Sequence, residues 1–226
     1  MIEYLDSLDR TIFLYLNGIH NHFFDVFMWY VSKTATWALM MLFFFFIIFR
    51  NNWKIALCII VGMALTITFA DQISSGMIKD LVERLRPTHN PEIENLVHTV
   101  RGYKGGLYGF VSSHAANTFG VAIYLSLLFK NRYITLFMIL WSLLVSYSRI
   151  YLGVHYPGDI LGGMVVGLVS GIVAYKIYEY SISYLKFDKK ENFIDKNEKN
   201  AKIMFYGILC NLLITVGVSL FICFLA

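Results

Sequence analysis

Six apolar stretches, separated by polar joints, dominate the hydrophobic pattern of the chain. Each is long enough to cross a bilayer as a helix with some tilt. They run over residues 25–49, 54–77, 113–130, 133–149, 158–182 and 202–225. Ahead of them, residues 4–19 alternate charged and apolar side chains at helical spacing, which is typical of a helix lying in the membrane interface. The pattern predicts an all-α fold, a polytopic transmembrane bundle of about six spans with an N-terminal interfacial helix.

The composition agrees with an integral membrane protein. Of the 226 residues, 58% are hydrophobic and only 15% are charged, which leaves too little polar surface to cover a core in water. The net charge of +4 is spread without a basic stripe, so the sequence argues against a nucleic-acid partner. The three cysteines lie inside apolar runs, and their spacing fits neither a disulfide framework nor a metal site.

Basic residues divide the joints between two faces of the membrane. The short joints at one face hold Arg50, Lys54, Lys130, Arg132, Lys186, Lys189, Lys190, Lys196, Lys199 and Lys202. Cytoplasmic loops carry an excess of lysine and arginine, so these joints should be cytoplasmic. The long segment 78–112, the joint 149–157 and both termini then share the outer face.

Three polar patches lie at the outer ends of the predicted spans. They read "KDLVERLRP" from residue 79, "VSSHA" from residue 111 and "SRIYLGVHYPGD" from residue 148. Ionisable groups at membrane depth are costly and usually functional. We therefore expect the three patches to meet in one site.

The first chemical feature of that site is an excess of positive charge. Lys79, Arg86 and Arg149 would repel one another in a partly desolvated pocket unless a multiply charged anion joined them. Guanidinium forks and a lysine suit phosphate oxygens. Ser112 and Ser113 open a helix whose free N–H groups also favour phosphate. These five residues are the candidate phosphate-binding set.

The second chemical feature is a pair of histidines, His114 and His155, with Asp159 behind the latter. A histidine oriented by an aspartate is held in the tautomer needed for attack, and the aspartate stabilises the cation that forms. The other histidine can protonate a leaving oxygen.

The order Lys-x6-Arg-Pro, Ser-x-His and Ser-Arg-x5-His-x3-Asp resembles the motifs of the type 2 phosphatidic acid phosphatase (PAP2) superfamily of membrane lipid-phosphate phosphatases. The resemblance implies that His155 is the nucleophile and forms a phosphohistidine, that Asp159 orients it, and that His114 protonates the leaving lipid oxygen. It also implies that no metal and no cofactor is needed. The sequence departs from the family at Val111 and Ser113, where the second motif usually has proline and glycine.

We expect residues 1–226 to form one membrane domain. The amphipathic helix would occupy residues 1–24, the PAP2-like catalytic core residues 54–182, and an extra span residues 202–225. The short chain and tight joints suit a bacterial inner membrane with a periplasmic active site.

The resemblance leaves the substrate open among membrane lipid phosphates. Undecaprenyl diphosphate and lipid A phosphate are favoured, with phosphatidylglycerol phosphate or phosphatidic acid as the alternative. A vanadate-binding haloperoxidase-like protein and a non-catalytic lipid-binding protein are the further rivals. The roles of His89, His98, Arg101 and Lys104 stay open. So does the oligomeric state, because Gly163, Gly167 and Gly171 indicate a close helix contact that is either internal or between subunits.

Overall fold

The structure, a computed structural model, describes residues 2–50, 52–187 and 197–225 of the chain. Its α-helices are α1 (Ile2–Asn17), α2 (His22–Val31), α3 (Ala38–Phe49), α4 (Trp53–Ile73), α5 (Lys79–Val82), α6 (Ser113–Phe129), α7 (Arg132–Tyr151), α8 (Pro157–Tyr184) and α9 (Asn197–Leu225). The described residues form no β-sheet beyond an isolated bridge between Leu85 and Tyr108. The prediction of an all-α fold is confirmed.

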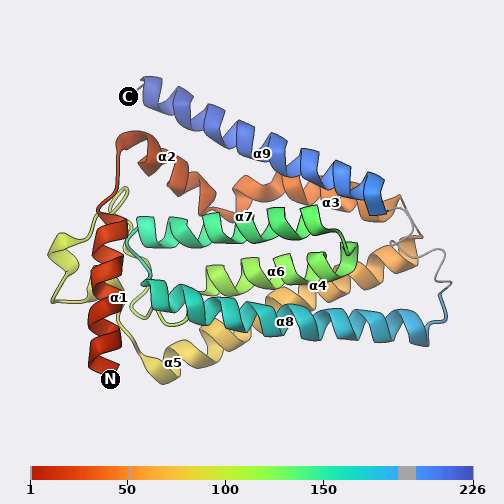
Figure 1. Ribbon diagram of the computed structural model, residues 1–226, viewed down its shortest axis with the longest axis horizontal. Helices are drawn as coiled ribbons and strands as arrows, with labels where there is room; N and C mark the ends of the chain where they lie inside the picture. Colours follow the sequence, from red (N-terminus) through yellow and green to blue (C-terminus); the bar gives the residue numbers. More distant parts are fainter. Residues whose placement is uncertain (1, 51, 188–196, 226) are drawn as a thin grey trace.

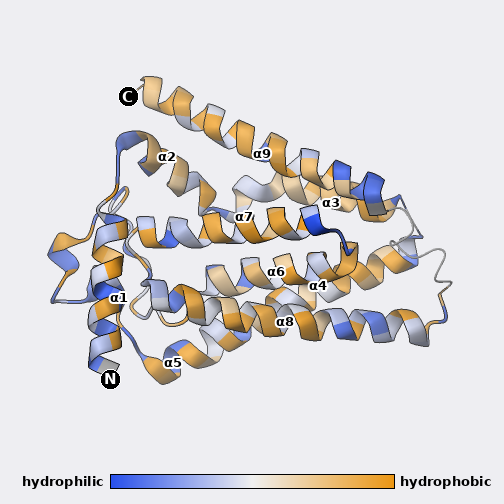
Figure 2. Cartoon of the chain, viewed as in Figure 1, coloured by the Kyte–Doolittle hydropathy of each residue, from blue (hydrophilic) through white to orange (hydrophobic). Residues whose placement is uncertain are grey.

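The long helices lie roughly along one direction and form a bundle (Figure 1). The stretch Trp53–Val82 and helices α7, α8 and α9 are long and apolar enough to cross a membrane. Helix α6 is apolar but shorter, and α2 and α3 pass the same test only as a bent pair. Apolar residues predominate along these helices, while polar residues gather toward the ends of the bundle (Figure 2). The chain is an integral membrane protein.

The predicted span over residues 25–49 is wrong in one respect, because the structure bends it by 73° between α2 and α3. Helix α2 ends at Val31 with Ser32 as its C-cap, and Lys33 takes an extended conformation before a short 3₁₀ turn, Thr34–Trp37. The break leaves carbonyl groups without helical partners at membrane depth. Trp37 donates its indole N–H to Val31 O (3.0 Å), which satisfies one of them.

A second boundary also differs from the sequence prediction. The amphipathic helix was expected over residues 1–24, but α1 ends at Asn17 and residue 22 already begins α2. Asn17 explains the end, since its side-chain amide donates to the carbonyls of His98, Ile150 and Tyr151. Helix α1 is thereby attached across one end of the bundle, roughly perpendicular to the long helices (Figure 1).

Three glycines of α8 lie at a close contact with α6 in the bundle core. A Cβ atom at Gly163, Gly167 or Gly171 would come within 2.6 Å of a backbone oxygen of Ser112, Ala116 or Gly120. Only glycine permits this approach, so α6 and α8 pack backbone to backbone. The predicted close contact is confirmed, and it is internal to the chain.

The two ends of the bundle differ in what they carry. The α3–α4 and α6–α7 joints, with Arg50, Lys54, Lys130 and Arg132, lie at one end (Figure 1). At the other end lie α1, the long segment between α5 and α6, and the joint between α7 and α8. Three of the predicted basic-joint residues lie outside the described residues: Lys189, Lys190 and Lys196.

Candidate active site

His155 lies in the short joint between α7 and α8 and is 1% exposed. Its Nδ1 is 3.2 Å from Oδ2 of Asp159, which is itself fully buried one helical turn later. Since a carboxylate only accepts, Nδ1 carries the proton of this bond, and Nε2 keeps its lone pair. Pro157 begins α8 two residues after His155, and this start of the helix places Asp159 beside the His155 ring.

Arg86 faces the other side of the His155 ring. Its Nη1 lies 3.2 Å from His155 Nε2 and also donates to Val154 O, while its Nε donates to Tyr108 O. The segment carrying Arg86 is held by antiparallel backbone bonds, Arg86 N to Leu107 O and Gly109 N to Arg84 O. The resting ring therefore has a donor from Arg86 at the atom that would attack phosphorus.

Electrostatics keep His155 neutral. Its pKa lies well below the ordinary value, first because the ring is buried and then because Arg86, Arg149 and Lys79 place positive charge around it. Burial, together with the charge of Arg149, also lowers the pKa of Arg86. The site thus holds a neutral imidazole among cations that repel one another, and a phosphoryl dianion would relieve that repulsion.

Arg149 approaches from the last turn of α7 and is 3% exposed. It donates to Ser32 Oγ at the break between α2 and the 3₁₀ turn, and to the Tyr103 hydroxyl (3.2 Å). The hydroxyl of the neighbouring Ser148 donates back to Val145 O of its own helix (2.6 Å). Ser148 therefore supports α7 and leaves Arg149 as the charged group that this turn offers.

Lys79 reaches the site from the end of the α4–α5 span, after a π-helical turn, Ser74–Ile78. Its Nζ donates to the Ser113 hydroxyl (2.7 Å), which also contacts Ser75 Oγ (2.7 Å). Ser112 caps α6 by accepting from Ala115 N (3.4 Å). The first turn of α6 is thus aimed at the same place as Lys79.

His114 follows on α6 and differs from His155 in being partly exposed. Among the described residues, no side chain hydrogen-bonds its ring, although Arg149, His155, Arg86 and Lys79 act on it electrostatically. It borders a cavity of about 260 Å³. The lining of the cavity includes the polar side chains of Ser32, His114 and Asn117, and apolar side chains such as Trp37, Met63 and Trp141. Its mostly apolar lining, with a few polar side chains beside His114, suits a lipid phosphate.

The structure brings together every residue of the predicted set. They are His155, His114, Asp159, Lys79, Arg86, Ser112, Ser113 and Arg149, from the ends of α5, α6, α7 and α8 and their joints. The site lies at the end of the bundle opposite the Arg50 and Arg132 joints, as Figure 1 shows for the helix ends concerned.

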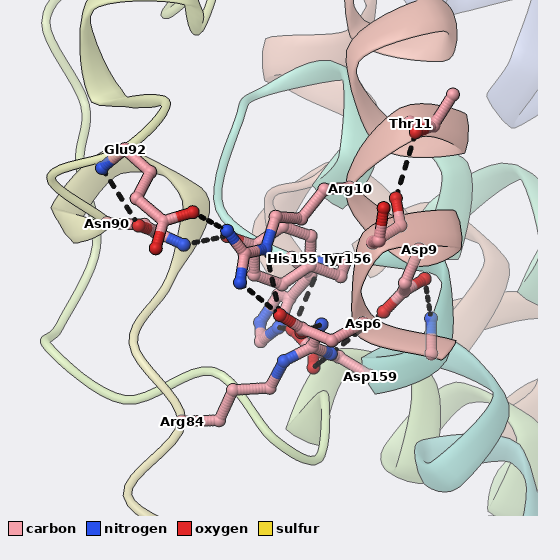
Figure 3. Close-up of polar contacts among 12 residues, drawn as sticks. Asp6, Asp9, Arg10, Thr11, Arg84, Asn90, Glu92, His155, Tyr156 and Asp159 are labelled. Atoms are coloured by element: carbon pink, nitrogen blue, oxygen red, sulfur yellow. Dashed lines mark hydrogen bonds and ion pairs between the residues drawn. The ribbon is translucent and has the colours of Figure 1, made fainter. Parts of the chain in front are cut away.

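Sequence reasoning missed the support around Asp159. Arg84 donates to Asp159 Oδ1 (3.0 Å) and pairs with Asp6 and Asp9 of α1 (both 2.8 Å), as drawn in Figure 3. The available signals were the position of Arg84 inside the first patch and the spacing of Asp6 and Asp9, which places them on one face of a helix. Tyr103 and Ser75 were also missed, because nothing in their local pattern marks them.

The four loop residues whose roles were left open have different places. His98 binds Asp25 Oδ1 (2.8 Å) and stacks on His20 (ring centroids 3.7 Å apart), so it holds the long segment to the start of α2. His89 contacts the Thr88 hydroxyl (3.2 Å). Arg101 lies over the ring of Trp29 at 5.4 Å, and Lys104 is exposed.

Comparisons with known proteins agree on the class of site. Residues 55–183 match the model of the PAP2 superfamily. The chain is 42% identical to a lipid A 4′-phosphatase of Bacteroides thetaiotaomicron, over 92% of this chain and 94% of that protein. It is 40% identical to a lipid A 4′-phosphatase of Porphyromonas gingivalis, over 80% and 78%.

A solved structure gives the corresponding fold. A transmembrane PAP2-type phosphatidylglycerolphosphate phosphatase from Bacillus subtilis superposes with a TM-score of 0.59 at 23% identity, covering 78% of this chain and 87% of that chain.

Proposed function

The chain belongs to the PAP2 superfamily and is a membrane lipid phosphatase, and on this basis we propose that it hydrolyses the 4′-phosphate of lipid A through a phosphohistidine on His155. One observation carries the mechanism. His155 has its Nδ1 bonded to Asp159 while Nε2 faces the cationic cluster, as a nucleophile requires.

In the first half of the proposed reaction, the Nε2 lone pair forms a bond to phosphorus as the bond from phosphorus to the lipid oxygen breaks. The electron pair of the broken bond stays on that oxygen, and His114 gives it a proton, which releases the lipid alcohol. Asp159 stabilises the positive charge that appears on the His155 ring. Lys79, Arg86, Arg149, and the N–H groups at the start of α6 hold the three phosphoryl oxygens.

In the second half, a water oxygen attacks phosphorus from the side that the lipid has left. His114, now neutral, accepts a proton from this water as the bond between phosphorus and Nε2 breaks. The electron pair returns to His155, and inorganic phosphate leaves. The fixed cations carry the charge of both transition states.

The substrate assignment rests on how much of the chain is shared with the relatives. The Bacteroides thetaiotaomicron protein matches over 92% of this chain, which includes segments outside the family core at residues 55–183. The cavity beside His114 supports a lipid leaving group, because its apolar lining would accept part of the lipid while the phosphate stays with the cations.

We also propose the topology. The bent pair α2–α3, the stretch α4–α5, and helices α6, α7, α8 and α9 would give six spans, with α1 in the interface. The basic joints would face the cytoplasm of a bacterial inner membrane, which puts the active site and both termini on the periplasmic side. Reaction of single cysteines placed near residues 104 and 131 with an impermeant thiol reagent in intact cells tests this orientation. Labelling at 131 but not at 104 would reverse it.

The function is tested with purified full-length protein and a panel of lipids. The panel holds lipid A phosphorylated only at the 4′ position, lipid A phosphorylated only at the 1 position, undecaprenyl diphosphate and phosphatidylglycerol phosphate. We expect the fastest phosphate release from the 4′-phosphate lipid and none from the His155→Gln variant. Faster release from undecaprenyl diphosphate would replace the substrate assignment and leave the class of enzyme unchanged.

A further inference from the structure

We infer that Arg84, held by Asp6 and Asp9 of the N-terminal helix, is a positioning residue that fixes the carboxylate of Asp159 behind His155. This inference rests on the proposed function, because it needs His155 and Asp159 to act as the catalytic pair. It gives a role in the reaction to a helix that lies outside the family core at residues 55–183.

The first step of the argument concerns the two oxygens of Asp159. Oδ2 accepts from His155 Nδ1 (3.2 Å) and from Tyr156 N (3.0 Å). Oδ1 accepts from Arg84 Nη1 (3.0 Å), its only bond to a described residue. The carboxylate is fully buried, so without Arg84 this oxygen would be a charged acceptor with neither water nor a partner. The carboxylate would then turn to find one, and the bond to His155 would be disturbed.

The second step concerns what holds Arg84 in place. Its guanidinium lies between three carboxylates: Asp159, Asp9 and Asp6. It also lies over the Tyr156 ring, 4.1 Å from the centroid. Burial alone would lower the pKa of Arg84, but the charges and hydrogen bonds of the three carboxylates raise it, so the side chain stays charged. Figure 3 shows Arg84 reaching Asp6 and Asp159 together.

The third step concerns Asp9. Its Oδ2 pairs with Arg84 (2.8 Å), while its Oδ1 accepts from Gly158 N (2.8 Å) in the first turn of α8. The same carboxylate therefore holds the guanidinium and caps the helix that carries Asp159. Burial is the main cause that raises the pKa of Asp9, and the nearby Asp159 adds to it. The two carboxylates would repel each other without Arg84 between them.

The chain also offers a matched control. Arg10 lies one turn after Asp6 on α1, and it pairs with Asp6 and with Glu92 of the long segment between α5 and α6. It does not contact Asp159 (Figure 3). Removing Arg10 weakens the attachment of α1, whereas removing Arg84 also takes away the partner of Asp159. Comparing the two variants separates a docking role from a positioning role.

The experiment measures kcat and KM of Arg84→Gln, Arg84→Lys and Arg10→Gln on whichever lipid phosphate the wild type hydrolyses fastest. A hydrogen bond to a charged group predicts that Arg84→Gln lowers kcat by about 10- to 100-fold, with little change in KM. Arg84→Lys should recover part of the loss, and Arg10→Gln should stay within about threefold of wild type. Equal losses of kcat in Arg84→Gln and Arg10→Gln would mean that Arg84 only attaches α1 to the bundle.

Coupling to Asp159 is the decisive readout. In an Asp159→Asn background, adding Arg84→Gln should lower kcat by less than about threefold, because the carboxylate that Arg84 positions is gone. Full additivity of the two losses would overturn the inference. If Arg84→Gln does not fold in detergent, Asp9→Asn keeps an acceptor for Gly158 N and should lower kcat by about three- to tenfold; an unchanged kcat in that variant would also overturn it.

The outcomes keep the two proposals apart. A wild type that releases phosphate from no lipid phosphate counts against the proposed function itself. An active wild type whose His155→Gln variant is inactive, together with an unaffected Arg84→Gln variant, counts only against the positioning role.

Discussion

The two histidines of the site have opposite surroundings. His155 is 1% exposed, with one ring nitrogen at Asp159 and the other at Arg86. His114 is partly exposed, has no hydrogen bond from its ring to a described side chain, and borders the cavity. A nucleophile benefits from one fixed orientation. A proton donor must instead meet an oxygen that arrives with the substrate, so it cannot be fully occupied beforehand.

The same contrast extends to the segments around each histidine. We call these segments the His155 wall and the His114 wall. The His155 wall is held through Asp159, Arg84 and α1. The His114 wall faces the bent pair α2–α3, where Ser32 meets Arg149. One side of the site is held by ion pairs to α1, and the other borders the cavity that we propose would accept part of the lipid. The four predictions below test this difference, beginning with the largest effect.

Substitution of His155 should have the largest effect. The variant His155→Gln removes the proposed nucleophile, so phosphate release should fall by about 10⁴- to 10⁶-fold on every substrate. After a quench in alkaline detergent, which preserves the acid-labile bond of a phosphohistidine, a reaction with labelled substrate should leave labelled phosphate on the wild type and none on this variant. Retention of label in His155→Gln would move the covalent intermediate to another residue.

Substitution of His114 should have a smaller effect that depends on the substrate. His114→Gln removes the proposed general acid, which should lower the rate by about 10²- to 10⁴-fold when the leaving group is a lipid alcohol. On p-nitrophenyl phosphate, whose leaving group needs no proton, the loss should nearly disappear. Equal losses on both substrates would mean that His114 binds the phosphate and does not protonate the leaving oxygen.

The pH dependence of stability should report the buried, neutral state of His155. Its folded pKa lies well below the unfolded value of about 6.5, so the unfolded chain alone takes up this proton as the pH falls below 6.5. The contribution of His155 to stability is therefore full above that pH and declines by about 1.4 kcal/mol per pH unit below it.

The measurement compares unfolding in detergent at pH 7.5 and pH 5.5. The difference should be smaller in His155→Gln, which lacks the titrating ring. The same difference in both proteins would show that His155 does not remain neutral in the folded state.

Metal removal should have the smallest effect, since the proposed charge stabilisation comes from Lys79, Arg86 and Arg149. Phosphate release should be unchanged by EDTA and by omission of divalent cations. A requirement for magnesium would mean that the ion, and not these fixed side chains, stabilises the charge of the transition state.

The sequence by itself determined the class of the protein and which residues form its candidate site. Apolar stretches of spanning length predict a helical membrane bundle, because each must satisfy its own backbone hydrogen bonds in lipid. Three patches at the ends of those stretches carry His114, His155 and Asp159 with their cations, and fixed spacing makes them recognisable. The glycines of α8 likewise predicted a close contact from spacing alone.

Only the tertiary structure decided what completes that site. Arg84 meets Asp6 and Asp9 across more than seventy residues of chain, and Tyr103 and Ser32 reach Arg149 from two further segments. The bend after α2 also depends on partners such as Trp37 that satisfy the freed carbonyls. The local sequence pattern indicates which positions along one element are buried, whereas these contacts depend on how separate elements pack. The physical cause is that a buried charge takes whichever partner the fold brings to it.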